Sequence, residues 1–184
     1  MHLSQRWTRL CAQETGWELV NEGINGDTTG GMLARMQGGV LAELREGGLG
    51  ADRPYVLLMG GSNDVFYSGS DAAARGNMGA MIHQLFSVGV LPMVGIPLPA
   101  DAPHAPRAWA VAVDFEAAER TMKEYCAWLK RYCTAFGVPY IDFCADFLSP
   151  DGSIRSELLL DGLHPTPEGH QIMARRLCAH LKRE

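Results

Sequence analysis

Three short apolar segments, separated by amphipathic helical patterns, constrain the fold of this 184-residue chain most strongly. Residues 54–60, 90–96 and 138–143 are largely apolar, which is typical of strands that are covered on both faces of a parallel sheet. Residues 70–88 and 117–136 lie between these segments and carry apolar side chains every three or four residues, as amphipathic helices do. Strands that alternate with helices predict an α/β fold with a parallel sheet and right-handed crossovers.

The N-terminal part of the chain continues this alternation. Apolar side chains at helical spacing predict a first helix, which Ser4 can cap and Gly16 ends. Residues 17–21 predict a short strand, and a loop rich in turn formers follows it. Residues 32–46 predict a helix that the glycine pair at residues 38–39 interrupts.

The C-terminal part supplies a loop and a last helix. Residues 97–106 contain four prolines and predict an exposed loop at the carboxyl end of a strand, which makes it a candidate rim for a site. Thr166 and Pro167 predict the cap and the first residue of the final helix. Residues 1–184 show no internal repeat or linker, so we expect a single domain whose core needs neither disulfides nor a metal.

The composition narrows the functional classes. With 16 basic and 21 acidic side chains the net charge is -5, which disfavours nucleic acid and anionic membranes as partners and favours a small-molecule substrate. No secretion signal begins the sequence and no stretch approaches the roughly 18 apolar residues of a membrane span, so we expect a cytoplasmic protein. The cysteines lack metal-binding spacing and are expected to be reduced core residues; they are Cys11, Cys126, Cys133, Cys144 and Cys178.

A carboxylate and a histidine three residues apart mark the segment DGLHP at residues 161–165. Asp161 can orient the imidazole of His164 as a general base, which supplies two thirds of a hydrolytic triad. Two other predicted loops lie at the carboxyl ends of strands, where ligands bind in such sheets. There the backbone N–H of Gly26 and the side-chain amide of Asn63 are the donors that an oxyanion hole needs. Together these residues predict acyl transfer.

These motifs resemble the sequence blocks of a known enzyme family. The segments NEGINGDTT (21–29), GSND (61–64) and DGLHP (161–165) are similar, in order and spacing, to the second, third and fifth blocks of the SGNH, or GDSL-type, hydrolases. The resemblance implies a three-layer α/β/α fold with a flavodoxin-like parallel sheet and the hydrolysis of esters without a metal or other cofactor. It also assigns the base, its orienting acid and the two oxyanion donors to the four residues named above.

One block of the family has no counterpart in this sequence. The family begins with a strand that ends in Gly-Asp-Ser and carries the nucleophile, whereas this sequence begins at what would be the next helix. We therefore expect a gap in the middle of the sheet and an incomplete chain, started at an internal Met1. We expect Cys144, without a cationic neighbour to lower its pKa, to be inert. The serines near the expected site are poor replacements for the nucleophile; they are Ser62, Ser68 and Ser70.

Other polar residues near these motifs have simpler interpretations. Asp64 is expected to cap a helix or close an Asx-turn, and Asp27 or Thr28 to cap the helix that follows. His104, on the proline-rich loop, is expected to be a surface residue more than a substrate contact. The other histidines show no metal-ligand spacing, and residues 23–31 lack the GxGxxG order of a dinucleotide-binding loop.

We therefore expect an esterase or lipase-type acylhydrolase that cleaves small acyl or acetyl esters by a Ser-His-Asp mechanism, with its serine outside this sequence. The absence of a long apolar lid favours short acyl chains. The alternative is a catalytically silent relative that keeps the site and binds a small ester or glycan, or an N-terminally truncated gene product.

Overall fold

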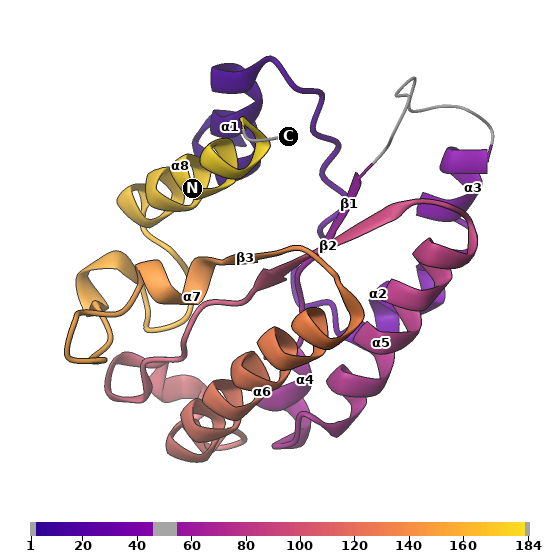
Figure 1. The fold of residues 1–184 in the computed structure, drawn as a ribbon. Coiled ribbons are helices and arrows are strands. Elements are labelled where there is room, and N and C mark those ends of the chain that lie inside the picture. The colour runs from indigo at the N-terminus through magenta and orange to yellow at the C-terminus, as the bar shows by residue number, and fades with distance from the viewer. Residues whose placement is uncertain (1–2, 46–54, 183–184) are drawn as a thin grey trace.

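The computed structural model describes residues 3–45 and 55–182, and it confirms the predicted α/β fold with a parallel sheet (Figure 1). Within these residues the sheet has the order β1-β2-β3, and both neighbouring pairs are parallel. Leu58 at the end of the first strand lies opposite Val94 in the second. The strands are β1 (Tyr55–Leu58), β2 (Leu91–Ile96) and β3 (Tyr140–Asp142).

Helices cover both faces of the sheet, which gives the three-layer α/β/α arrangement (Figure 1). One face is covered by α1 (Trp7–Thr15), α7 (Phe143–Asp146) and α8 (Pro167–Leu181). The other face is covered by α2 (Thr29–Met36), α3 (Val40–Arg45), α4 (Ser62–Ser68), α5 (Ala72–Ser87) and α6 (Phe115–Phe136). Short 3-10 helices lie at Leu3–Gln5, Ala102–His104, Arg107–Trp109 and Ser156–Leu158.

Side chains of the strands alternate between two cores, as the pleat of a sheet requires. In β1, Val56 and Leu58 pack with residues of α2, α5 and α6, whereas Tyr55 and Leu57 pack with residues of α1 and α8. Both faces of the strand are therefore covered by apolar side chains. This is the physical reason why the segment is apolar at consecutive positions and not at alternate ones.

Helix α1 packs along α8, although the two helices lie near opposite ends of the sequence (Figure 1). Its first N–H, from Trp7, donates to Nδ1 of His170 at 3.3 Å. Further along, the Sγ atoms of Cys11 and Cys178 lie 2.9 Å apart, and both residues are buried. Burial raises the pKa of the Cys11 thiol to about 12, so this side chain behaves as a small apolar core residue, as predicted.

Residues 17–21 do not form the predicted strand. They have no regular secondary structure, and Val20 is 53% exposed. A strand needs a partner along its edge to bond its backbone groups, and within the described residues β1 pairs only with β2. Among the described residues, this segment therefore has no neighbouring strand to pair with, although its composition suits a strand.

The first helix ends as predicted but begins differently. Its last turn closes on Gly16, whose φ of 74° is the left-handed conformation that glycine tolerates best. Its N-cap is Arg6, which makes no side-chain cap, and Ser4 lies in a separate 3-10 turn. The predicted Ser4 cap is therefore wrong, because the 3-10 turn separates the hydroxyl from the first α-helical turn.

The helix predicted over residues 32–46 is two helices, and the first begins earlier. Helix α2 starts at Thr29 because the Oγ1 of Thr28 accepts the N–H of Gly31 at 3.2 Å, which confirms Thr28 as the cap. The chain breaks after Met36, at the glycine pair, as predicted. The predicted end of this helix, residue 46, lies outside the described residues.

The proline-rich segment is exposed only in its second half. Leu98 and Asp101 are buried, and the N–H of Asp101 donates to the carbonyl of Gly162 at 2.8 Å. His104 and Trp109, farther along, are exposed. The prediction of a wholly exposed loop is therefore wrong, because the loop that holds Gly162 packs against its first half.

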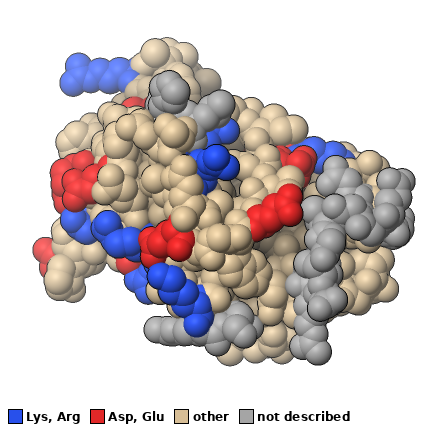
Figure 2. Space-filling model, turned by 90° about the horizontal axis from the view of Figure 1, so that it is seen from above, with Lys and Arg blue, Asp and Glu red and all other residues tan. Residues whose placement is uncertain are grey.

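The surface carries no single-sign charged region on the face drawn in Figure 2. Lysine and arginine side chains alternate there with aspartate and glutamate among uncharged residues (Figure 2). Among residues 3–45 and 55–182, no helix combines the length and the apolar character that crossing a membrane requires.

Candidate active site

Asp161 and His164 form a closed hydrogen-bonded unit on the loop before α8. The Nδ1 of His164 lies 2.9 Å from Oδ2 and 3.1 Å from Oδ1 of Asp161. The same carboxylate accepts the backbone N–H of His164 at 2.9 Å and that of Leu163 at 3.1 Å. The N–H of Leu160 donates to the carbonyl of His164 at 2.7 Å and closes the loop. The imidazole is thus held by its own segment, as the spacing of the motif predicts.

The state of this carboxylate decides which ring nitrogen is basic. Burial raises the pKa of Asp161, but hydrogen bonds from the ring and backbone of His164 outweigh burial and hold the pKa below its ordinary value of 3.8. A carboxylate only accepts hydrogen bonds, so the proton between the two groups belongs to Nδ1. The Nε2 atom of His164, which has no partner among the described residues, is left as the basic nitrogen.

Gly26 lies in the turn before α2, and Asn63, in the first turn of α4, bonds to the residue that follows it. The side-chain Nδ2 of Asn63 donates to the carbonyl of Asp27 at 2.7 Å, which fixes the orientation of the amide and uses one of its two N–H groups. Gly26 has a φ of 75°, and its carbonyl accepts the hydroxyl of Tyr67 at 3.4 Å. The structure therefore brings together the two residues that the sequence proposes as oxyanion donors.

Asp64 has a different role from the predicted one. It does not cap its own helix; its buried carboxylate accepts the N–H of Thr29 at 2.9 Å and the hydroxyl of Thr29 at 2.6 Å. The Nδ2 of Asn77 donates to the same hydroxyl at 3.1 Å. Asp64 thus joins the start of α4, which carries Asn63, to the start of α2. Sequence reasoning missed this link because the two residues are 35 positions apart.

Between β1 and α4, Gly61 occupies a position that no larger residue can take. Gly61 has a φ of 113°, and a Cβ atom there would lie 2.3 Å from the ring of Tyr125. The hydroxyl of Tyr125 donates to the carbonyl of Gly60 at 3.1 Å. The side chain of Tyr125 therefore fixes the turn that aims α4, and any residue larger than glycine would displace it.

A second Asp-x-x-His pair lies beside the first. The Nδ1 of His104 is 2.8 Å from Oδ2 of Asp101, on the turn that follows β2. A Cβ on Gly162 would lie 2.6 Å from the carbonyl oxygen of Asp101 and 2.9 Å from the carbonyl carbon of His104. The two turns are therefore in backbone contact. The sequence placed His104 on the surface, and the DxxH spacing at residues 101–104 was the signal for the partner that it missed.

Two of the candidate replacement nucleophiles, Ser68 and Ser70, hydrogen-bond to nearby backbone groups. The Oγ of Ser68 donates to the carbonyl of Asp64 at 2.7 Å, and the Oγ of Ser70 accepts the N–H of Ala72 at 3.2 Å. Within the described residues, no serine hydroxyl contacts the ring of His164. The described serines therefore do not complete a triad.

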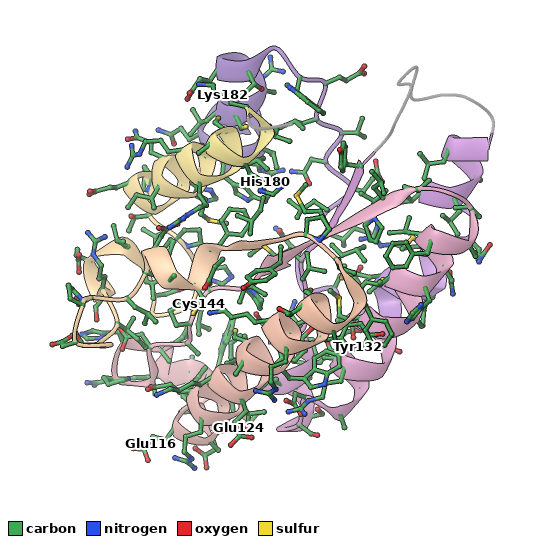
Figure 3. The ribbon with its side chains drawn as sticks, viewed as in Figure 1. Glu116, Glu124, Tyr132, Cys144, His180 and Lys182 are labelled. Atoms are coloured by element: carbon green, nitrogen blue, oxygen red, sulfur yellow. The ribbon has the colours of Figure 1, made fainter. Side chains whose placement is uncertain are left out.

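Cys144 does have neighbours that lower its pKa, so that part of the sequence prediction is wrong. A hydrogen bond from Cys126 is the main cause, and the charge of Lys130 acts in the same direction against burial. Cys144 lies on α7 on the side toward α6, where it packs against the core (Figure 3). Its contacts are thus with α6, and none of the described contacts joins it to His164.

Two cavities in the described part of the molecule do not include Asp161 or His164. One of about 650 Å³ is lined by α1 and by the segment from Trp17 to Asn21. A second, of about 350 Å³, is lined by residues of α2 and α3 and by Glu22 and Ile24. In the described ranges no three His, Cys, Asp or Glu side chains gather as a metal site. The hydrogen-bonded Asp161–His164 unit is therefore a feature of the exposed loop and not of either cavity.

Comparison with known proteins gives a family and a fold. The model of the GDSL-like lipase/acylhydrolase family matches residues 2–172. A member of the lipolytic protein G-D-S-L family from Veillonella parvula aligns with a TM-score of 0.76 at 19% identity, over 100% of this chain and 91% of that chain. The aryl esterase of M. smegmatis aligns with a TM-score of 0.77 at 20% identity, over 100% and 87%. A carbohydrate acetylesterase from Sinorhizobium meliloti aligns with a TM-score of 0.77 at 19% identity, over the same shares.

No curated protein matches the sequence. The structural alignments, all under 25% identity, support the three-layer α/β/α fold, and the family match covers most of the chain. The chain therefore belongs to the GDSL-like lipase/acylhydrolase family of ester hydrolases.

Proposed function

We propose that this chain carries the base and oxyanion machinery of a hydrolase for small acyl or acetyl esters, with His164 as the base. The observation that carries the proposal is the Asp161 carboxylate on Nδ1 of His164, which fixes the basic nitrogen at Nε2. The neighbouring pair of Gly26 and Asn63 supports it, because amide N–H groups are the donors that stabilise an oxyanion.

The reaction follows from these positions. A serine hydroxyl gives its proton to Nε2 of His164 and attacks the ester carbonyl, and the carbonyl oxygen becomes an oxyanion. The Gly26 N–H and the second N–H of the Asn63 amide donate to that oxyanion, and one such donor contributes about 3 kcal/mol to the transition state. His164 then gives the proton to the leaving alcohol as the C–O bond breaks, and the acyl group stays on the serine. A water molecule next gives a proton to Nε2 and attacks the acyl-serine, and His164 returns that proton to the serine oxygen as the acid leaves. Asp161 stabilises the imidazolium that forms in each half of the reaction.

The serine is proposed to come from a strand that is not among the described residues. Within those residues β1 has a strand partner only on the β2 side, and residues 17–21 carry a strand-like sequence without a partner. A strand between them would bond both sets of backbone groups and would end at the same edge of the sheet as Asn63. This arrangement matches the flavodoxin-like order that the sequence resemblance implies.

Hydrolysis of p-nitrophenyl acetate tests the proposal, measured on a form of the protein that carries the nucleophile serine together with these 184 residues. We expect His164→Ala to lower kcat/KM by at least about 100-fold, the usual contribution of a general base. The matched control is His83→Ala, which removes a histidine on α5 whose Nε2 lies 3.0 Å from the hydroxyl of Tyr132; Tyr132 extends from α6 toward α5 (Figure 3). Equal activity of the two variants would contradict the role of His164.

The competing function is a silent binding protein that retains the site without the nucleophile. It is supported by the absence of a serine contact to His164 among the described residues. A folded chain that binds the ester without turning it over, by ligand-observed NMR, would favour this second function over the first.

A further inference from the structure

The Asp101–His104 pair repeats the geometry of Asp161–His164 on an adjoining turn. In both pairs the histidine follows the aspartate by three residues, and Nδ1 lies within 2.9 Å of a carboxylate oxygen. In both pairs the histidine side chain is mostly exposed, at 63% and 62%. Both rings therefore present their Nε2 edge near the same rim of the sheet.

Burial distinguishes the second pair from a surface ion pair. Asp101 is only 4% exposed, and the His104 ring is the partner of its carboxylate among the described residues. A buried carboxylate is costly unless it is hydrogen-bonded, so this contact is a fixed part of the turn. The ring itself buries little apolar surface, and packing therefore does not explain its place.

The position of the pair is fixed relative to His164. The turn at residues 101–105 follows β2 at its carboxyl end, the edge where ligands bind in such sheets. Its backbone rests on Gly162, two residues before His164, through the Asp101 N–H and close contacts at His104. A substrate that reaches His164 therefore comes near the His104 turn as well.

The chemistry of the pair selects the ligand. Because a carboxylate accepts hydrogen bonds, Nδ1 of His104 carries the proton, and Nε2 is an acceptor without a partner in the described part of the chain. The oxygens of a simple ester also only accept, so they offer Nε2 nothing. A hydroxyl group on the alcohol part of the ester is a matching donor. Trp109, 45% exposed on the same segment, adds an aromatic face of the kind that lines ligand sites.

We propose that His104 is a specificity residue that accepts a hydrogen bond from a hydroxyl on the alcohol part of the substrate. The site then favours esters of polyhydroxylated alcohols, such as sugar acetates with free hydroxyls, over plain alkyl or aryl esters. Asp101 is the positioning residue that holds the ring in the accepting tautomer. This inference rests on the proposed function, because it places the ester beside His164.

Paired substrates test the proposal on the same serine-containing form of the protein. With methyl 6-O-acetylglucoside, we expect His104→Phe to lower kcat/KM about 5- to 10-fold, mainly through a higher KM, as the loss of one neutral hydrogen bond does. With p-nitrophenyl acetate the same variant stays within about twofold of the wild type, because that ester has no hydroxyl. His104→Gln, whose amide oxygen can accept, restores at least half of the loss. The matched control, His83→Phe, leaves kcat/KM unchanged for both substrates.

Equal losses of His104→Phe on both esters, or none on the glucoside, overturn the proposal. If this form of the protein hydrolyses neither ester, the proposed ester hydrolysis fails, but the His104 contact can still be tested. Binding of the unreacted glucoside, measured by saturation-transfer NMR, then decides whether His104 contacts the hydroxyl. Binding that His104→Phe weakens and His83→Phe does not supports the hydroxyl contact. Undetectable binding, or binding equal in both variants, refutes it.

The tautomer of the His104 ring distinguishes a positioning role of Asp101 from a merely structural one. In ¹⁵N-edited spectra of the wild type we expect the His104 Nε2 signal of an unprotonated nitrogen. Asp101→Asn, which can donate as well as accept, mixes the two tautomers and raises KM for the glucoside. A folded Asp101→Asn variant with the wild-type tautomer and KM contradicts the positioning role.

Discussion

Asp64→Asn tests the link that holds α4, with Asn63, against the start of α2. In the wild type the carboxylate accepts two hydrogen bonds from Thr29, one from the backbone at 2.9 Å and one from the hydroxyl at 2.6 Å. The amide keeps one acceptor but turns an NH₂ group toward the hydroxyl, which already accepts from Asn77. The threonine hydroxyl hydrogen then has no acceptor in a site with no exposed surface on Thr29.

The magnitude follows from these contacts. A hydrogen bond to a charged group contributes about 1.5–3 kcal/mol, and an unsatisfied buried donor costs about 1–3 kcal/mol. We therefore expect Asp64→Asn to lower the free energy of unfolding by about 2–3 kcal/mol. For a chain of this length that corresponds to a fall in Tm of about 4–12 °C. With a typical urea m-value it shifts the unfolding midpoint by about 1 M.

Urea unfolding followed by circular dichroism measures the effect, and a double-mutant cycle isolates its cause. In a Thr29→Val background, which lacks the hydroxyl, Asp64→Asn should cost about 1–2 kcal/mol less than in the wild type. Lys182→Gln, which removes an exposed ion pair with Glu14, serves as the control and should leave the midpoint unchanged. An unchanged midpoint for Asp64→Asn, or an equal cost in both backgrounds, would refute the reasoning.

Two further predictions concern the contact of the Gly162 turn with Asp101 and the contact of His170 with Trp7. Gly162 has a φ of 75°, and Gly162→Ala places a Cβ 2.6 Å from the carbonyl oxygen of Asp101. Urea unfolding should therefore show a free energy of unfolding that is lower by about 2 kcal/mol or more. A variant as stable as the wild type would mean that the two turns do not touch. Burial and the charge of Arg6 lower the pKa of His170 from 6.5, so the neutral ring that accepts from Trp7 stabilises the fold above pH 6.5. That stability is lost as the pH falls from 6.5 through the lowered pKa, and urea titrations at pH 7.5 and 5.5 should show a slope that His170→Asn reduces; an identical slope would contradict the assignment.

The parts of the fold that the sequence predicts are those that depend on local pattern. The segments that became β1, β2 and β3 are apolar because both of their faces are covered, and α6 shows its buried stripe directly in the sequence. Residues 17–21 show the limit of this reasoning. Their composition suits a strand, but a strand exists only when a neighbour bonds its edge, and composition does not reveal the neighbour.

The candidate site divides in the same way. Asp161 and His164 are three residues apart, so their contact is a local one that spacing can predict. The links of Asp64 to Thr29, and of the Asp101 turn to Gly162, join segments 35 and about 60 residues apart, and tertiary packing alone creates them. Sequence reasoning consequently named the residues on the predicted loops and missed the groups that hold those loops in place.

The packing of α1 against α8 affects the order in which the chain can fold during synthesis. During synthesis α8 leaves the ribosome about 150 residues after α1, a delay of about 8–30 seconds at ordinary elongation rates. During that time the apolar side of α1 around Cys11 has no partner helix. The central strands and α5 and α6 can assemble first, because their contacts are closer in sequence. Docking of α1 onto α8 is thus a late step of assembly, although α1 precedes all three strands in the sequence.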